Sequence, residues 1–309
     1  MTASTIRVAT RGSALARWQA AHVARLLAAD DPGVVVEEVV VETSGDRRPD
    51  IPIWELGGKG VFVKEVQAAV LDGRADVAVH SAKDLPALTH PDLVIACVPT
   101  RADPRDVLVG STLAGLPAGA VVATGSVRRR AQLAGLRPDL TFAGLRGNID
   151  TRLGRAPEFG AIVMAAAALH RLDRASEITE VLEPEVMLPQ VGQGALAVEC
   201  RGDDRALRQR LAAVEHHPSR LAVEAERGFL AELGGDCDLP AAAHATLSAT
   251  GQLRVEGLIA SLDGHVVLRH ARTQPVPSHA VDAIGPADLG SAVARYLLDD
   301  AGGASLLGR

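Results

Sequence analysis

The stretch VATRGSALAR at residues 8–17 is echoed by VATGSVRRRAQ at residues 122–132. In both copies a short apolar run leads through Gly-Ser into a helix-like pattern, which is the local order of a strand followed by a helix. The two copies stand at matching places in successive strand-helix units. The echo therefore predicts two similar α/β lobes, and twin-lobed α/β proteins bind ligands in the cleft between lobes, at the carboxyl ends of strands.

The first hundred residues alternate between strand and helix patterns. Strand-like runs occupy 6–10, 34–43 and 76–80, and helical runs occupy 14–30 and 61–73. This alternation predicts a mostly parallel sheet. The connection over 43–60 is rich in Gly, Pro and charge and is long for a compact domain, which is typical of a lid or a disordered segment.

The rest of the sequence predicts a second lobe and a C-terminal segment with a different pattern of helices and strands. The second α/β unit begins near residue 103, and we expect the strand ALAVEC at 195–200 to return the chain to the first lobe. Beyond residue 219 a helical run precedes three alternating runs with turns at Thr250-Gly251 and Asp263-Gly264, which predicts a small α+β domain with a three-stranded antiparallel sheet. The expected domains are 1–98 with 195–216, 103–192 and 219–309.

Composition limits the possible classes of function. The chain has 309 residues, enough for two or three domains, and 47% of them are hydrophobic while 2% are aromatic. So few aromatic side chains cannot form a stacking platform for single-stranded nucleic acid. The first residues, MTASTIRVATRGS, lack the apolar core of a signal peptide, and no later stretch resembles a membrane span. We expect a cytoplasmic protein that binds neither nucleic acid nor membrane.

Positive charge is unevenly distributed in this acidic chain. The formal net charge is −6, and the 32 basic residues comprise 29 Arg and 3 Lys. Nine of the arginines fall within one segment of the second lobe: Arg128, Arg129, Arg130, Arg137, Arg146, Arg152, Arg155, Arg171 and Arg174. A local arginine field in an acidic protein indicates a small polyanionic ligand rather than a long nucleic acid.

The motif HSAKDLP at 80–86 places His80, Ser81, Lys83 and Asp84 where a strand ends. A carboxylate at that position beside a cleft can stabilise a cation or carry protons. The alternative is a solvated loop with ordinary surface charges.

Three helix starts combine free backbone N–H groups with hydroxyls or guanidinium groups. They are Arg11-Gly12-Ser13, the stretch GSVRR at 125–129 and the stretch LRGNIDTR at 145–152. Such starts suit carboxylates or phosphates, which Arg can hold with two hydrogen bonds. The alternative for any single helix start is a solvated basic face. Three similar starts in two lobes are harder to explain in that way.

The three cysteines, Cys97, Cys200 and Cys237, are odd in number and far apart, which argues against a disulfide framework and a zinc ribbon. Cys237 lies in LGGDCDLPA at 233–241, between two carboxylates that should raise the pKa of its thiol. Reactive redox or protease cysteines have the opposite, electropositive surroundings. We expect no metal site, because no metal-ligand spacing of His or Cys is present.

Six motifs in order along the chain resemble the porphobilinogen deaminase family: VATRGSALARWQA, GGKGVFVKE, ADVAVHSAKDLP, ATGSVRRRAQL, LRGNIDTRL and LPQVGQGALAVECR. The resemblance implies two lobes of the periplasmic-binding-protein type, a third α+β domain and a monomer. It also implies a transferase of tetrapyrrole and heme biosynthesis, in which a covalent dipyrromethane cofactor is extended by four porphobilinogen molecules with loss of ammonia. Hydrolysis then releases the linear tetrapyrrole hydroxymethylbilane.

The resemblance also implies roles for individual residues. Asp84 matches the catalytic carboxylate, which would hold the pyrrole N–H of the cationic azafulvene left when ammonia departs. Cofactor binding falls to Cys237 through a thioether, and to Lys83, Asp84, Ser126, Arg128, Arg129 and Arg146. Substrate binding falls to Arg11, Ser13, Arg152, Arg171 and Gln193. Lys59 and Phe62 match a segment that covers the cleft.

The sequence departs from the family pattern at a few positions. Gly125 replaces a common hydroxyl, and His170 stands where a Lys is frequent. Asp236 and Asp238 flank the cofactor cysteine where uncharged or small residues are familiar, and we expect both to point away from the cofactor.

Two alternatives remain at this stage. The first is a non-catalytic twin-lobed receptor for a small anion, which would explain the arginines but not a third domain that presents a cysteine loop. The second is a family member that has lost its activity, against which the presence of Asp84, Cys237 and the arginines argues.

Overall fold

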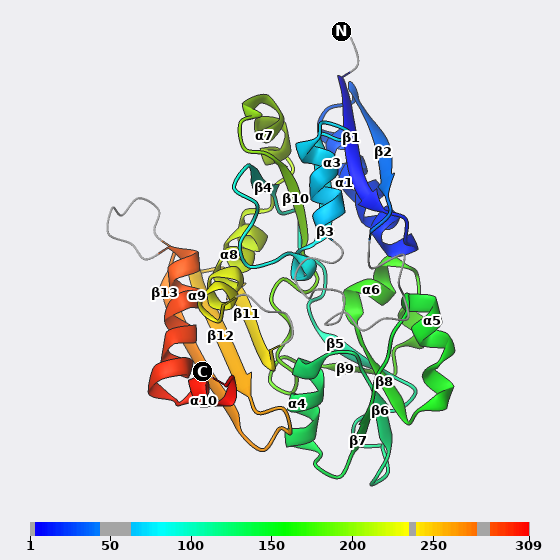
Figure 1. Cartoon of the computed structure of the whole chain (residues 1–309), viewed down its shortest axis with the longest axis vertical. Coiled ribbons are helices and arrows are strands. Elements are labelled where there is room, and N and C mark those ends of the chain that lie inside the picture. The colour runs from blue at the N-terminus through cyan, green and yellow to red at the C-terminus, as the bar shows by residue number, and fades with distance from the viewer. Residues whose placement is uncertain (1–3, 44–62, 235–238, 277–284, 309) are drawn as a thin grey trace. The chain divides into compact units, whose positions relative to one another are not determined.

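The computed structural model describes residues 4–43, 63–234, 239–276 and 285–308 (Figure 1). The chain divides into two compact units. The first, unit 1, comprises Met1–Ala102 and Ala195–Arg220, and the second, unit 2, comprises Asp103–Gly194 and Leu221–Arg309.

Unit 1 is built on a five-stranded sheet in the order β2-β1-β3-β10-β4. Its elements are β1 (Ser4–Arg11), α1 (Ala14–Asp30), β2 (Val34–Val41), α3 (Lys64–Leu71), β3 (Val77–Ser81), a 3-10 turn (Ala82–Asp84), β4 (Leu93–Cys97), β10 (Leu196–Arg201) and α7 (Arg205–Ala212). β1 runs parallel to β2 and β3, whereas β10 runs antiparallel to β3 and β4. The late strand β10 therefore lies between two early ones.

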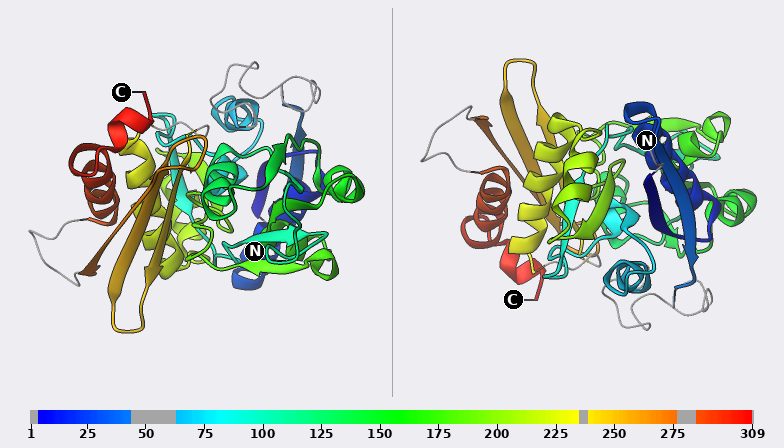
Figure 2. Two further views of the ribbon diagram at one scale, coloured as in Figure 1. Left: turned by 90° about the horizontal axis from the view of Figure 1, so that it is seen from below. Right: turned by 90° about the horizontal axis from the view of Figure 1, so that it is seen from above.

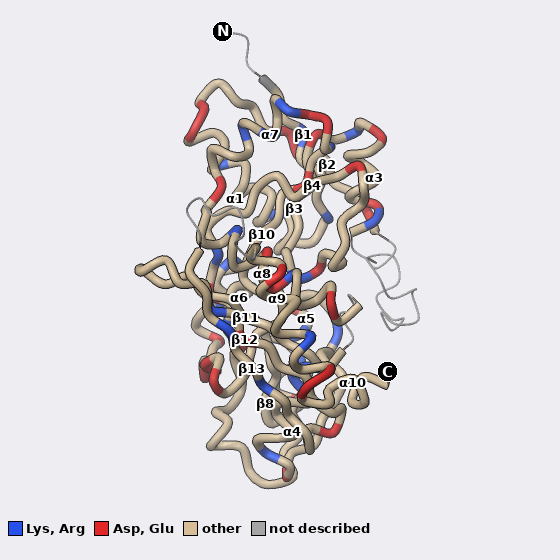
Figure 3. Tube along the Cα trace, turned by 90° about the vertical axis from the view of Figure 1, so that its left-hand side faces the viewer, with Lys and Arg blue, Asp and Glu red and all other residues tan. Residues whose placement is uncertain are grey.

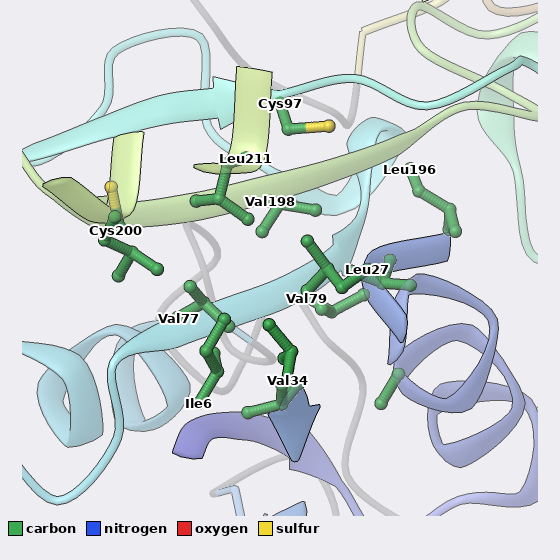
Figure 4. Packing of buried hydrophobic residues seen from close by; sticks show 14 residues of the cluster. Ile6, Leu27, Val34, Val77, Val79, Cys97, Leu196, Val198, Cys200 and Leu211 are labelled. Atoms are coloured by element: carbon green, nitrogen blue, oxygen red, sulfur yellow. The ribbon is translucent and has the colours of Figure 1, made fainter. Parts of the chain in front are cut away.

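The core of unit 1 is aliphatic, as Figure 4 shows. Ile6, Val77, Val79 and Val198 project from three neighbouring strands, and Leu27 joins them from α1. β-branched side chains pack well on a pleated surface, so a core without aromatic rings can still be dense.

Cys97 and Cys200 belong to the same aliphatic core and are fully buried. Burial raises the pKa of Cys97 to about 12 and that of Cys200 to about 11. Both therefore remain protonated thiols near neutral pH and are poor nucleophiles.

The lobe part of unit 2 repeats this plan in the order β7-β6-β8-β5-β9. Its elements are β5 (Asp106–Val109), β6 (Val121–Ala123), α4 (Val127–Leu136), β7 (Thr141–Ala143), α5 (Ile149–Gly154), β8 (Ala161–Ala165), α6 (Ala166–Arg171) and β9 (Glu180–Leu182). Again three parallel strands are followed by one antiparallel strand, here β5. The two sheets match strand for strand, which confirms the prediction of two similar α/β lobes.

The rest of unit 2 is an antiparallel sheet, β11-β12-β13, with helices on it. Its elements are α8 (His217–Glu232), which belongs to unit 2 from Leu221 onward, β11 (Ala241–Leu247), β12 (Gln252–Ala260), β13 (Val267–Pro275), α9 (Pro286–Arg295) and α10 (Gly303–Leu306). Gly251 and Gly264 adopt φ of +73° and +74° in the two hairpin turns, where a residue with a Cβ would be strained. The predicted three-stranded α+β segment is confirmed.

Two helices cover one face of this small sheet (Figure 2). A Cβ on Gly257 of β12 would lie 2.4 Å from the Phe229 ring of α8 and 2.8 Å from Val293 of α9. The helices also touch each other through glycines, since a Cβ on Gly290 would lie 1.8 Å from the carbonyl oxygen of Ala225. Only the absence of a side chain at Gly290 permits this approach.

Charges of both signs are spread along the described parts of the trace in both units (Figure 3). Within the described ranges, no helix has the length and hydropathy needed to cross a bilayer.

We predict that Gly290→Ala destabilises the protein by about 1–3 kcal/mol, because the new methyl group would collide with the backbone of α8. Urea unfolding followed by circular dichroism would measure the loss. The matched control is Gly154→Ala at the end of α5, where a Cβ would meet no atom within 4 Å. Equal stability of the two variants would show that the two helices do not need a glycine contact.

Candidate active site

Unit 1 contains a pocket where β1 and β3 end and α1 begins. Its polar lining consists of Arg11, Ser13, Gln19, His80, Ser81 and Asp84, and its apolar lining of Leu15, Ala16, Val63, Val66 and Val79. The parallel pairing of β1 with β3 brings their carboxyl ends together, and with them the two motifs at 8–17 and 80–86.

The backbone around the pocket is held by local hydrogen bonds. Ser13 caps α1, because its Oγ accepts a hydrogen bond from the Ala16 N–H at 3.3 Å. The buried amide of Gln19 donates to Ser81 Oγ at 2.8 Å. These contacts connect the start of the helix to the end of β3.

Asp84 is the last residue of the 3-10 turn and is exposed. The turn is tied to β10, because the Ala82 N–H donates to the Ala195 carbonyl at 3.0 Å. A carboxylate on an anchored turn, next to a pocket that also contains Arg11 and Ser13, can accept N–H donors from a ligand. The structure thus brings together three of the residues that the sequence assigned to catalysis and substrate binding, and Lys83 is half-buried in the same turn as Asp84.

Unit 2 contains a buried cluster centred on Asp106, the first residue of β5. Arg128 Nη1 donates to Asp106 Oδ2 at 2.7 Å, and Arg129 Nε donates to Asp106 Oδ1 at 2.9 Å. Both arginines come from the first turn of α4, whose N-cap Ser126 accepts from the Arg129 N–H. Main-chain carbonyls of Leu188 and Val163 accept further hydrogen bonds from the two guanidinium groups.

Gln193 lies behind this cluster and is fully buried. Its Nε2 donates to Asp106 Oδ1 at 2.8 Å and to the Pro104 carbonyl at 2.7 Å. The neighbouring Gly192 N–H donates to the buried carboxylate of Glu226 in α8, which also accepts from the Ala245 N–H of β11. Glu226 therefore ties the Gln193 loop to the C-terminal sheet.

The cluster holds more positive than negative charge. Burial alone would raise the pKa of Asp106, but the charges of Arg128 and then Arg129 outweigh it and hold that pKa well below its usual range. One carboxylate thus faces two guanidinium groups, so a positive charge remains inside the protein. Within the described chain, the buried Nε and Nη2 of Arg128 have no hydrogen-bond partner. Unsatisfied buried donors of this kind are expected where an anionic ligand belongs.

The remaining predicted arginines lie on the same lobe. Arg171 ends α6, is buried and donates to the Gly194 carbonyl at 2.7 Å, and burial lowers its pKa to about 10. Arg152 lies in α5 and donates to the Gly147 carbonyl at 2.8 Å, while Arg146 is half-buried just before that helix. All three belong to unit 2 together with Arg128 and Arg129.

One departure from the family pattern has a structural reason. A Cβ on Gly125 would lie 2.8 Å from the carbonyl oxygen of Leu145, so a larger residue would push away the loop that carries Arg146. His170 is exposed at the end of α6. Lys59, Phe62, Asp236, Cys237, Asp238 and most of the 43–60 loop lie outside the described residues, so their predicted roles remain predictions.

The sequence analysis missed Asp106 and Glu226. Asp106 precedes the apolar run VLV, and a carboxylate at the start of a buried strand is a usable signal for a buried partner. Glu226 gives no such signal, because it occupies one position of a helix that also carries other acids.

Family models and curated relatives both match this chain over most of its length. A family model described as "Porphobilinogen deaminase, dipyromethane cofactor binding domain" matches residues 6–209, and one described as "Porphobilinogen deaminase, C-terminal domain" matches residues 220–299. The porphobilinogen deaminase of Nitratidesulfovibrio vulgaris (strain DSM 19637 / Miyazaki F) is 48% identical over 301 residues, covering 96% of this chain and 94% of the relative. That of Roseiflexus castenholzii is 48% identical over 310 residues, with 98% and 99% covered.

Among solved structures, a probable amino-acid ABC transporter extracellular-binding protein from Bacillus subtilis is similar with a TM-score of 0.39. It is 11% identical, and the match covers 68% of this chain and 90% of that one.

We predict that Asp106→Asn lowers stability by roughly 3–5 kcal/mol, because it leaves two buried guanidinium groups without their carboxylate. Since the folded-state pKa of Asp106 lies below its ordinary value of 3.8, its stabilisation is present above that pH and is lost as the pH falls further. Urea unfolding at pH 7 and in acid would measure both effects. The control is Asp103→Asn, a part-exposed partner of Arg105, and equal losses in the two variants would contradict the special role of the cluster.

Proposed function

The chain belongs to the porphobilinogen deaminase family, and from this premise we propose that Asp84 is the catalytic carboxylate with which it assembles hydroxymethylbilane from porphobilinogen. The family models and the relatives make it a transferase of tetrapyrrole biosynthesis with a dipyrromethane cofactor. They do not favour the non-catalytic anion receptor, since the similarity covers the whole enzyme, including the C-terminal domain.

The observation that best supports the assignment of the cofactor residues is the excess positive charge around Asp106. The cofactor carries acetate and propionate side chains, and carboxylates are the partners that two buried guanidinium groups and the unsatisfied donors of Arg128 require. The described residues therefore fit the group. When bound, it supplies the pyrrole α-carbon to which new units are joined.

In this proposal Cys237 holds the cofactor through a thioether, and Lys83, Ser126, Arg128, Arg129 and Arg146 bind its carboxylates. Gln193 would serve the substrate, and its hydrogen bonds to Arg129 and Asp106 would also help to hold these two side chains in place. Arg152 and Arg171 add positive charge for the acidic substrate.

The pocket of unit 1 supports the role of Asp84 in the chemical step. Loss of ammonia from porphobilinogen leaves a positive charge that spreads onto the pyrrole nitrogen. The Asp84 carboxylate, on its anchored turn, would accept the pyrrole N–H and stabilise that charge, while Arg11 and Ser13 in the same pocket would bind the acidic side chains of the substrate. Lys59 and Phe62 keep their proposed covering role.

We also propose a cytoplasmic location and a monomeric state for this enzyme. Both rest on the resemblance of the chain to the porphobilinogen deaminase family.

We expect Asp84→Asn to lower the rate of porphobilinogen consumption roughly 100-fold or more, with little change in the melting temperature. The amide keeps the shape of the side chain but loses the charge that stabilises the cation. Asp92→Asn, which changes another exposed carboxylate of unit 1, should retain full activity. Near-normal consumption by the Asp84 variant would move the catalytic role to another group.

The intact denatured protein should weigh more than its sequence by two linked pyrrole units, located on Cys237 by peptide mapping. Because Cys97 and Cys200 are buried thiols with raised pKa values, the native protein should contain no fast-reacting thiol at pH 8 while the cofactor is attached. Protein from cells unable to make porphobilinogen should contain one. An unmodified mass from cells that do make porphobilinogen would contradict the cofactor assignment.

A further inference from the structure

His80 belongs to the pocket of unit 1, but the proposed function gives it no role. It is the fourth residue of β3, 6% exposed, and lines the pocket together with Asp84 and Arg11. A histidine at the buried end of a strand is costly to place in an aliphatic sheet unless its polar ring atoms have partners. Its surroundings therefore indicate what the ring can do.

A fully buried carboxylate lies behind the ring. Glu199 of β10 stands opposite Ala78 in the antiparallel ladder, so its side chain is on the same face of the sheet as His80, one diagonal step away. His80 Nε2 lies 3.1 Å from Glu199 Oε2. The two atoms are within hydrogen-bond distance, although the contact does not have the geometry of a formed hydrogen bond. Catalytic hydrogen bonds are often poorly aligned before substrate binds.

The carboxylate itself is held in place from the other side. Gln67 of α3 donates its Nε2–H to the same Glu199 oxygen at 2.8 Å, in a fully buried contact. The order of groups is therefore an amide, a carboxylate, an imidazole and then the pocket. This is the arrangement by which a carboxylate fixes the tautomer and orientation of a histidine that exchanges protons.

The charged groups around the ring come from three elements. Of the described residues that line the pocket, Arg11 of β1, His80 of β3 and Asp84 of the 3-10 turn are ionisable. α1 contributes the uncharged Ser13 and Gln19, and β10 contributes Glu199 from behind. Asp84 is thus accompanied by a second group able to carry a proton.

We propose that His80, oriented by Glu199, is a second catalytic residue, which accepts the proton released when two pyrroles are joined. This inference rests on the proposed function. In that step the C–N bond of the aminomethyl group breaks and nitrogen leaves as ammonia. A C–C bond forms between the methylene carbon and the free α-carbon of the acceptor pyrrole. The α-carbon then loses its proton to the imidazole, and the C–H electron pair restores the aromatic ring, so no oxidant is required.

The proposed role of Asp84 does not include taking up the proton that leaves the α-carbon. A carboxylate that holds the pyrrole N–H and stabilises the positive charge must stay ionised throughout the step, so it is poorly suited to take up the departing proton as well. A neutral imidazole backed by a buried carboxylate takes up a proton without leaving an isolated charge in the sheet. The two groups therefore divide charge stabilisation and proton transfer between them.

The test uses His80→Ala, His80→Gln and Glu199→Gln, prepared as holoenzymes whose mass shows the attached cofactor. His90→Ala is the control, because His90 is a part-exposed histidine of the same unit that does not line the pocket. We expect kcat for porphobilinogen to fall about 100-fold in both His80 variants and about 10-fold in Glu199→Gln, with KM nearly unchanged. Added imidazole should restore part of kcat in His80→Ala alone, which loss of a merely structural residue would not allow.

A second readout does not depend on activity. In protein labelled with ¹⁵N-histidine, the resonances that disappear in His80→Gln should show protonation at Nε2 in the wild type, and should change in Glu199→Gln. A kcat within twofold of wild type in either His80 variant would overturn the proposal, as would a stably folded His80→Ala enzyme that imidazole cannot rescue. If the Ala variant does not fold, the kcat of His80→Gln decides.

The result separates this inference from the proposed function. Wild-type protein that consumes no porphobilinogen would contradict the proposed function. An inactive Asp84→Asn beside a fully active His80→Gln would contradict only the role of His80.

Discussion

Unit 2 is built around a buried ion cluster in which Asp106 is shared by Arg128 and Arg129. Two guanidinium groups can be buried at the start of α4 only because a fully buried carboxylate lies between them. One carboxylate cannot neutralise both guanidinium groups, so the cluster keeps an excess of positive charge. This excess of positive charge suits the cluster to acidic groups, which supports the proposal that it binds the carboxylates of the cofactor.

The two lobes begin with the same local design but differ in chemistry. In each, a strand is followed within three residues by a serine that caps the next helix, Ser13 in unit 1 and Ser126 in unit 2. In unit 1 the cap is followed by small and apolar residues, and the pocket gains an exposed carboxylate from β3 and its turn. In unit 2 it is followed by three arginines, two of them buried. A repeated backbone motif therefore supplies one site suited to cation stabilisation and another suited to anion binding.

Much of the fold could be predicted from local patterns, because the strands and helices of both lobes follow clear apolar periods and turn signals. The echo between 8–17 and 122–132 predicted the repetition that the matching sheet orders confirm. Site residues in long motifs, such as Asp84 and Arg128, could be named because they stand at strand ends and helix starts.

Contacts between residues far apart in sequence could not be predicted in this way. Asp106 contacts Arg128, which lies 22 residues later in the sequence. His80 contacts Glu199 of β10, a strand that comes from a distant part of the chain and pairs with β3. Glu226, which ties the Gln193 loop to β11, occupies one of several acidic positions of its helix, and only tertiary packing distinguishes it.

The burial of Cys97 and Cys200 has a consequence for an enzyme that generates carbon electrophiles. When ammonia leaves the substrate, its methylene carbon becomes electrophilic, and such a carbon would alkylate an accessible thiolate nearby. In unit 1 both sulfur atoms are enclosed by aliphatic side chains and remain protonated at neutral pH. The aliphatic core of unit 1 therefore protects Cys97 and Cys200 from alkylation.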